Sequence, residues 1–353
     1  MITFENNNHI AQSVSELPTR FVGADNVYLD FETSSGDRDL DSLNPWHNCS
    51  IAGFGITVDL CPDAFYFDYK RADEEQKRAA IQYLQDVLYY AALWTNHNVK
   101  YDAHVAINNG IQLPPWLELV CTIVKAKIID SDRITHGGYG LDNLSLNWLN
   151  LDISKYEKAL QPYLRNNKDY GAIPTDIIGE YGCMDVQVNR LIDKFIGNKI
   201  PEASKEVALT EVKLTKELVK MEQRGMRYDV TKLQMAQLTT LNRISRIDDE
   251  LTKIVGRSFK PNSPDDCYQV LCGQYGLPII KYTTDSDGEE TENASFDKKV
   301  LVAYKAMPYA PLDVITRIIE FRKLSQRNSL FFVPWQKLAP DGIIRSEEHT
   351  SEL

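Results

Sequence analysis

The stretch NVYLDFETSS, residues 26–35, joins a strand-like apolar segment to two acidic side chains. Its first half, NVYL, has the composition of a buried strand. Asp30 and Glu32 lie two residues apart, and because side chains alternate along a strand, both carboxylates project from the same face. Two nearby carboxylates repel each other, and a divalent cation such as Mg²⁺ or Mn²⁺ would relieve that repulsion. The alternative is an exposed pair on an edge strand, so the meaning of this pair depends on other acids.

Length and composition are those of a folded chain with room for two domains. The sequence has 353 residues, of which 43% are hydrophobic and 25% are charged, as in ordinary globular proteins. No apolar run approaches the roughly 20 residues of a membrane helix, and the first residues do not resemble a secretion signal. The six cysteines are scattered without a CxxC pair, which disfavours a zinc site or a disulfide framework. We therefore expect an intracellular protein without membrane contact.

The net charge of −11 is concentrated in the first part of the chain. Residues 1–200 contain 17 Lys and Arg against 27 Asp and Glu, whereas residues 201–353 contain 22 against 23. A polyanion would need cations as intermediaries to bind the acidic part. A solvated acidic surface is the alternative explanation.

The hydrophobic pattern predicts an α/β first part and a mainly helical remainder. A meander of strands is followed by a helix and a further strand, which argues for an α/β layer. The strands are expected at 27–31, 50–57, 64–67 and 91–95, with a helix at 73–90 between the last two. Later helices include 120–130, 175–196 and 202–224, with a C-cap at Gly225, and loops are expected at 258–266 and 283–293. Gly and Pro residues near 195–205 indicate the domain boundary.

A third acid, Asp102, lies in the stretch TNHNVKYDAHV, where a strand is expected to give way to a helix. In an α/β sheet, ligands usually bind in the crevice outside the strand ends. The alternative role for Asp102 is a helix-start acid, since Asp is favoured in a first turn. His97 and His104 flank it at a spacing that does not place both on one helical face. We therefore expect surface histidines rather than metal ligands.

A fourth acid occurs in EYGCMDVQVNRLI, residues 180–192. Tyr181 and Asp185 are spaced i and i+4, so a helix would place the phenol and the carboxylate on one face. Such a pair is common by chance, and it gains meaning only in order after the other acids. No P-loop, dinucleotide-binding or serine hydrolase motif occurs in the sequence.

Taken together, DFE (30–32), NVKYD (98–102) and YGCMD (181–185) resemble, in order and spacing, the three exonuclease motifs of the DEDD superfamily. The tyrosine four residues before the last aspartate matches the DEDDy branch. HGGYGLDNLSLNWLNL (136–151) is similar to the linking helix in proofreading domains of family A DNA polymerases. ELVKMEQRGMRYDV (217–230) and the segments that follow resemble the thumb of the same family.

The resemblance implies an RNase H-like exonuclease fold of the α/β class, with a mixed central sheet flanked by helices, over residues 1–198. A mainly helical partial thumb would occupy residues 199–345. The location implied is the cytoplasm of a bacterial cell or a phage-infected host. Cys121-Thr122 stands where the family commonly has Asp-Thr, but that aspartate is not a metal-binding acid.

The end of the chain departs from the family pattern. SEEHTSEL, residues 346–353, is similar to a translated sequencing adapter, so we expect a non-native tail on a truncated chain. The palm and fingers motifs of the family do not occur in this sequence. We therefore expect no nucleotide addition by this chain. The remainder of such a polymerase, its palm and fingers, is expected to be missing from it.

By the same resemblance, Asp30 would bridge two Mg²⁺ (or Mn²⁺) ions, with Glu32 and Asp185 completing the tighter site. Asp102 would hold the second ion through water, and Tyr181 would orient the attacking water. The substrate would be the 3′ end of single-stranded DNA or a frayed primer terminus, and the product a nucleoside 5′-monophosphate.

Several polar and basic residues are candidates for contacts with the DNA strand, on the basis that phosphates attract cations. A solvated basic helix face is the alternative for those in the second half. They are Asn98 and Lys100 beside the third acid, and Arg317, Arg322, Lys323 and Arg327 in the second half.

Two other functions remain open from the sequence. An RNA-trimming enzyme of the RNase D type shares the acids, although it lacks the thumb-like second half. A catalytically inert DNA-binding fragment would keep the acids without a well-organised site.

Overall fold

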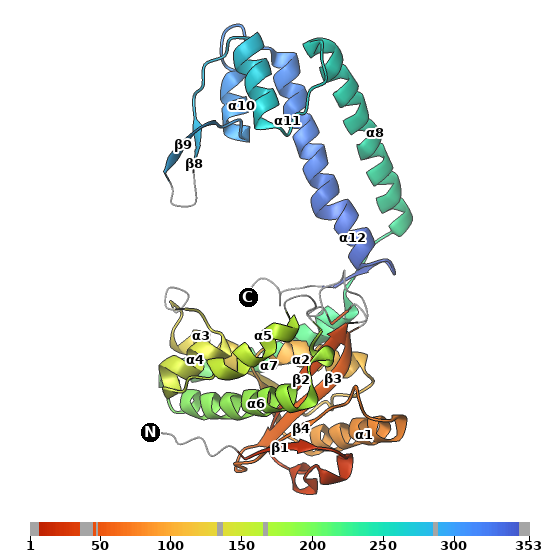
Figure 1. Cartoon of the computed structure of the whole chain (residues 1–353), viewed down its shortest axis with the longest axis vertical. Coiled ribbons are helices and arrows are strands. Elements are labelled where there is room, and N and C mark those ends of the chain that lie inside the picture. Colours follow the sequence, from red (N-terminus) through yellow and green to blue (C-terminus); the bar gives the residue numbers. More distant parts are fainter. Residues whose placement is uncertain are drawn as a thin grey trace. The chain divides into compact units, whose positions relative to one another are not determined.

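The computed structural model describes residues 7–35, 45–46, 49–132, 137–164, 169–284 and 289–345. These residues form two compact units, and the chain enters the second after Gly225 (Figure 1). The expected non-native tail, residues 346–353, lies outside the described residues.

The first unit extends further along the chain than the boundary expected after residue 198. Helix α7 (Lys205–Arg224) belongs to this unit, because its Val219 is buried in the core formed by the sheet. Gly225 ends the helix with φ of 61°, as a C-cap glycine does. The break before α7, where the boundary was expected, thus connects two helices of the same compact unit.

A six-stranded mixed sheet forms the centre of the first unit, in the order β1-β4-β3-β2-β5-β6. The antiparallel meander and the α/β class expected from the sequence are confirmed. Strand β6 occupies residues that we expected to begin a helix at 120, and it pairs in parallel with β5. The strands are β1 Asn8–Ala11, β2 Asn26–Ser35, β3 Cys49–Val58, β4 Ala64–Phe67, β5 Leu93–Asn96 and β6 Glu118–Cys121.

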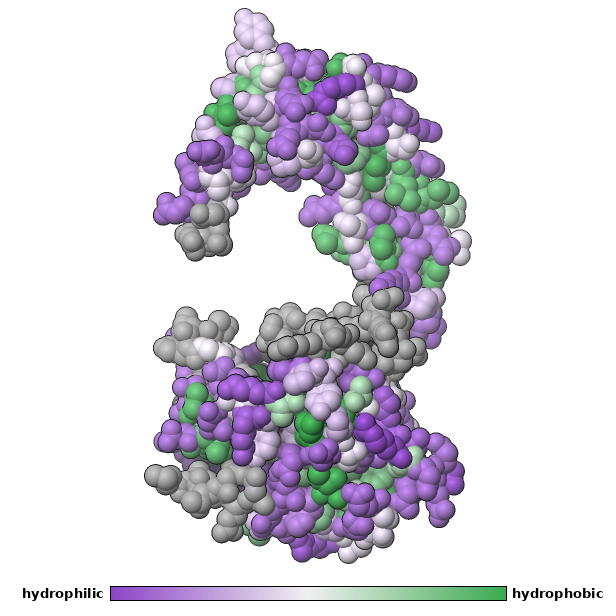
Figure 2. Space-filling view, viewed as in Figure 1, coloured by the Kyte–Doolittle hydropathy of each residue, from purple (hydrophilic) through white to green (hydrophobic). Residues whose placement is uncertain are grey.

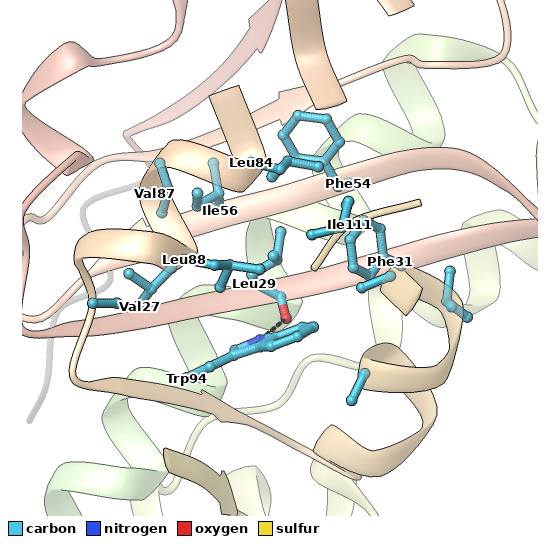
Figure 3. Packing of buried hydrophobic residues seen from close by; sticks show 14 of the residues in the cluster. Val27, Leu29, Phe31, Phe54, Ile56, Leu84, Val87, Leu88, Trp94 and Ile111 are labelled. Atoms are coloured by element: carbon cyan, nitrogen blue, oxygen red, sulfur yellow. Dashed lines mark hydrogen bonds between the residues drawn. The ribbon is translucent and has the colours of Figure 1, made fainter. Parts of the chain in front are cut away.

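Strand β2 divides its side chains between two cores. Val27 and Leu29 pack against Leu84 and Leu88 of helix α1 (Glu74–Tyr90) (Figure 3). Tyr28, between them, belongs to a separate cluster with residues of helix α6 (Thr175–Gly197). Because the faces alternate, Asp30 and Glu32 lie on the side of the sheet that α6 covers.

The remaining α-helices of the first unit lie between β5 and α6 in chain order. A π-helical turn over Ser145–Leu149 continues α4. These helices are α2 Val99–Asn108, α3 Thr122–Ile129, α4 Leu141–Leu144 and α5 Ser154–Leu164.

The second unit is mainly helical, as expected, around a core that includes Ile247, Leu301 and Ile315. One expected loop is in part a hairpin, because β8 and β9 pair antiparallel across residues 282–294. The α-helices and strands of the second unit are β7 Met226–Arg227, α8 Val230–Val255, α9 Pro264–Cys267, β8 Tyr282–Thr284, β9 Glu290–Ala294, α10 Lys298–Tyr304, α11 Leu312–Arg327, α12 Val333–Leu338 and β10 Ile343–Ile344. Strand β10 pairs with β7.

Hydrophilic side chains cover most of the visible surface of each unit, and smaller apolar patches are visible on both (Figure 2). Met235 and Leu238 of α8 are among the exposed apolar residues of the second unit. Within the described part of the chain, no helix is both long enough and apolar enough to cross a membrane.

Candidate metal centre

Three of the four acids singled out in the sequence meet at one point. One carboxylate oxygen from each of Asp30, Glu32 and Asp185 lies within 4.8 Å of the others. Asp30 and Glu32 come from β2, and Asp185 comes from the middle of α6. Residues 155 positions apart in the sequence are therefore brought to one side of the sheet.

Two glycines that sequence reasoning missed allow this convergence. Gly55 of β3 lies opposite Asp30 in the sheet. A Cβ atom on Gly55 would lie 2.3 Å from the carbonyl oxygen of Gly182 in α6, and one on Gly182 would lie 2.8 Å from the ring of Tyr66. Only glycine lets helix and strand backbones approach so closely. The sequence signal was the alternation of glycines in IAGFGITV beside the acid-bearing strand.

Asp102 lies beside this triad and is linked to it by an amide. Its Oδ1 accepts a hydrogen bond from the backbone N–H of Phe31 at 2.9 Å. Its Oδ2 accepts one from Asn96 Nδ2 at 2.7 Å, and the same nitrogen donates to Asp30 Oδ1 at 2.8 Å. Asn96, which ends β5, was not singled out in the sequence.

Burial raises the pKa of all four carboxyl groups above their ordinary values. The charge of Asp30 raises the pKa of Glu32, Asp102 and Asp185 further. Hydrogen bonds from Asn96 oppose these increases at Asp30 and Asp102. The ionised cluster is thus costly without a counter-charge.

The chemistry of the donor set fits a divalent cation. Oxygen-only carboxylate clusters suit Mg²⁺ and Mn²⁺. Glu32 Oε1 is buried and has no hydrogen-bond partner among the described residues. A buried carboxylate oxygen without a partner is rare in folded proteins, and a metal ion would supply the missing contact.

Tyr181 lies one helical turn before Asp185, on the same pocket wall. Burial raises the pKa of the Tyr181 phenol well above its usual value, and the charge of Asp185 raises it further. A hydrogen bond from Tyr181 lowers the pKa of Asp185 in return. Tyr181 therefore remains protonated and can donate a hydrogen bond at neutral pH.

The acids open into a pocket of about 1030 Å³ within the first unit. Its walls include all four acids, Tyr181, and polar residues of the β5–α2 connection. This is large enough for a nucleotide, since ligand pockets commonly have volumes of about 300–1,000 Å³.

The two residues expected to contact DNA beside Asp102 both line the pocket, and one of them also forms an ion pair. Asn98 lines the pocket, where it begins α2 with a left-handed φ of 69°. Lys100 lines the pocket as well, and its Nζ lies 2.8 Å from Oε1 of Glu222 in α7. Glu222 Oε2 also lies 2.6 Å from Nε2 of His104.

The expectation of surface histidines was wrong. His104 is fully buried between α2 and α7. His97 is half-buried, and its Nδ1 lies 2.8 Å from the hydroxyl of Thr122. Burial lowers the pKa of His97 to about 4, so the ring is neutral at physiological pH.

The basic residues of the second unit that were expected to contact DNA differ in whether they bond to other groups of that unit. Arg317 lies 2.7 Å from Glu250, and Arg322 donates to the Pro261 carbonyl at 2.7 Å. Both guanidinium groups thus stabilise the second unit itself. Lys323 and Arg327 are exposed and remain the stronger candidates for phosphate contacts.

The fold and this site define a mixed α/β protein with a buried carboxylate cluster suited to divalent cations. No protein-family model matches the chain. Known relatives are nonetheless found by sequence and by structure.

DNA polymerase I of Borreliella burgdorferi is 23% identical over 237 residues, covering 66% of this chain and 24% of that protein. DNA polymerase DpoZ of Acinetobacter phage SH-Ab 15497 is 27% identical over 225 residues, covering 59% and 34%. A structure of the POL domain of Pol1 from M. smegmatis, in complex with DNA primer-template and dNTP, has a TM-score of 0.62 and 14% identity. It covers 93% of this chain, which covers 49% of it.

The chain is therefore similar, over much of its length, to bacterial and phage DNA polymerases, including DNA polymerase I. The resemblance noted in the sequence is confirmed. The chain spans about a quarter to a third of the length of these curated relatives, 24% and 34%.

Proposed function

We propose that the chain is a metal-dependent 3′-to-5′ exonuclease, the proofreading part of a family A DNA polymerase. The observation that carries this proposal is the convergence of Asp30, Glu32 and Asp185 within 4.8 Å, in a pocket also lined by Asp102 and Tyr181. The RNase H-like exonuclease fold and a partial thumb after it are part of the same proposal.

Asp30, Glu32 and Asp185 would hold one Mg²⁺ or Mn²⁺, and Asp102 would contribute to a second. Bound divalent cations in such sites neutralise the charge of the scissile phosphate and make water a stronger nucleophile. Tyr181, kept protonated, would orient the attacking water through its hydroxyl. Water adds to the terminal phosphorus, the P–O3′ bond breaks, and the departing 3′-oxygen takes up a proton. The products are a nucleoside 5′-monophosphate and DNA shortened by one nucleotide.

DNA is the proposed substrate because the relatives are DNA polymerases and the M. smegmatis structure contains DNA primer-template. A single-stranded 3′ end or a frayed primer terminus would fit the pocket without unpairing. The bacterial and phage relatives support a location in the cytoplasm of a bacterial cell or an infected host.

The test uses the full chain with 5′-labelled single-stranded DNA and Mg²⁺ or Mn²⁺. We expect a ladder of successively shorter products, no ladder with Asp30→Ala, and an unchanged ladder with Asp25→Asn. Asp25 is an exposed acid that precedes the same strand, so it controls for charge and position. Intact DNA with the wild-type chain would reject the exonuclease.

The same assay separates the two alternatives. A matched RNA strand degraded faster than DNA would favour an RNA-trimming enzyme of the RNase D type. DNA binding in Ca²⁺ or EDTA, without cleavage in Mg²⁺ or Mn²⁺, would favour an inert DNA-binding fragment.

A further inference from the structure

A buried chain of hydrogen bonds leads away from the acids into the protein. Asn96 Oδ1 lies 3.1 Å from Asn189 Nδ2 of α6. Asn189 Oδ1 lies 2.9 Å from the hydroxyl of Thr122, the first residue of α3. Thr122 Oγ1 lies 2.8 Å from Nδ1 of His97. Asn96, Thr122 and Asn189 are each at most 1% exposed, so no bulk water competes for these bonds.

The direction of every bond in this chain is fixed by the acids at its end. Ionised carboxylates only accept hydrogen bonds, so Asn96 must direct its two N–H groups at Asp30 and Asp102. Its oxygen then accepts from Asn189, whose own oxygen accepts from Thr122. The single hydroxyl hydrogen of Thr122 is thereby used, so Thr122 accepts from His97.

This chain supports the acids in a way that general packing does not. The Asn96 amide provides two partially positive hydrogens between two carboxylates that repel each other. If the amide were free to rotate, its oxygen would face the same carboxylates and repel them. Asn189 prevents that rotation, and a second bond from Asn189 to the Thr95 carbonyl at 3.3 Å holds Asn189 in turn.

We propose that Asn96, Asn189 and Thr122 are positioning residues that fix the separation and orientation of Asp30 and Asp102 for binding of divalent cations. This inference rests on the proposed function, since it assumes that the acids bind metal. Asp102 has both oxygens engaged, by Asn96 and by the Phe31 N–H. These hydrogen bonds thereby hold the Asp102 carboxylate next to the Asp30–Glu32–Asp185 triad but outside it.

The test compares Mn²⁺ binding, measured by isothermal titration calorimetry, among isosteric variants. Thr122→Val and Asn189→Leu remove one link each without touching a carboxylate. We expect both variants to lower the Mn²⁺ affinity by about 10-fold or more, because the loss of groups that orient metal ligands through hydrogen bonds has effects of this size. Thr122→Ser keeps the hydroxyl and should bind Mn²⁺ like the wild type.

Thr57→Val is the matched control. Thr57 is also fully buried, and its hydroxyl donates to the Asp63 carbonyl at 2.7 Å, away from the acids. This variant loses a comparable buried hydrogen bond but should keep its Mn²⁺ affinity. Equal losses of affinity in Thr57→Val and Thr122→Val would show a general effect of stability and overturn the proposal.

A second readout is measured on the wild-type protein without added metal, and a variant is needed only to assign the signal. The bond directions require His97 to carry its proton on Nδ1, and ¹⁵N NMR of histidine-labelled protein, with ionised acids, distinguishes the two tautomers. A His97→Gln variant assigns the signal among the six histidines. A proton on Nε2 would overturn the proposed direction of the chain.

Failure of this inference can be separated from failure of the proposed function. If Asp30→Ala abolishes Mn²⁺ binding while Thr122→Val and Asn189→Leu bind normally, the positioning role is wrong and the metal site stands. If Mn²⁺ binding survives Asp30→Ala, the proposed metal site itself is wrong.

Discussion

The carboxylate cluster of the first unit and the paired acid Glu320 of the second unit have opposite surroundings. In the second unit, Glu320 lies 2.8 Å from Arg243, and that guanidinium lowers the pKa of Glu320. In the cluster of the first unit, burial raises the pKa of Glu32 and Asp185, and the groups that donate to the four acids, including Asn96 and Tyr181, are neutral.

The difference separates structural charges from functional ones. An acid that meets an arginine of its own chain is satisfied within the fold. Acids buried against one another reduce stability and persist where something outside the chain compensates them. Lys100 and Arg317, which the sequence suggested for DNA contact, are paired within the chain in the same way, with Glu222 and Glu250.

The largest effect is expected from removing an acid of the cluster. Asp185→Ala should lower the rate of 3′-end hydrolysis by at least about 100-fold, or about 2.7 kcal/mol of transition-state stabilisation, because it removes a proposed metal ligand. Single-turnover assays measure this rate. Asp176→Ala, an exposed acid on the same helix, should keep the wild-type rate. Equal rates for Asp185→Ala and Asp176→Ala would show that the clustered acid is no more important for hydrolysis than the exposed one.

The close approach of helix and strand should be almost as sensitive. Gly55→Ala places a methyl group 2.3 Å from a backbone oxygen of α6, which must move and carry Asp185 away. We expect the free energy of unfolding to fall by about 1–3 kcal/mol, with loss of hydrolysis. Chemical denaturation measures the change. Gly197→Ala, in α6 but with nothing within 4 Å of its new Cβ, should leave both properties unchanged.

The buried pair on α7 tests whether this helix belongs to the first unit. Glu222→Gln should lower the free energy of unfolding by about 1–3 kcal/mol, because Lys100 and His104 lose a charged partner. Glu217→Gln, which breaks an exposed pair with Lys220 on the same helix, should cost less than about 1 kcal/mol.

The Glu222 contribution should also depend on pH. Burial alone would raise the pKa of Glu222, but hydrogen bonds from His104 and Lys100 lower it below its ordinary value of 4.5. The stability that Glu222 adds is therefore present above about pH 4.5 and lost as the pH falls through the folded-state pKa. The difference between wild type and Glu222→Gln should shrink in acid, and a constant difference would contradict the ion pair.

The smallest effects are expected in the second unit. Lys323→Ala and Arg327→Ala should each weaken DNA binding about twofold to fivefold at low salt, with a shallower salt dependence, because each removes one phosphate contact. Fluorescence anisotropy at several salt concentrations measures this. Arg317→Ala should instead affect unfolding more than DNA affinity, since its guanidinium is held by Glu250 and Asp313. The reverse result would return Arg317 to the DNA surface.

Much of the fold followed from local pattern. The alternation in β2 predicted that Asp30 and Glu32 share a face, and the helical spacing predicted α6 and the end of α7 at Gly225. The hairpin at 282–294 was missed because its residues, rich in Asp, Thr and Glu, have the composition of a loop. Strand β6 was missed because a strand of four residues runs directly into α3.

The sequence by itself determined the α/β class, the relation to family A DNA polymerases and the order of the four acids, because periodicity and spacing are local properties. Only the tertiary structure decided which groups those acids meet. Asn96 reaches Asp30 across 66 positions, and Glu222 reaches Lys100 across 122. Such contacts depend on how closely distant backbones pack, as at Gly55 and Gly182, and no local pattern encodes that distance.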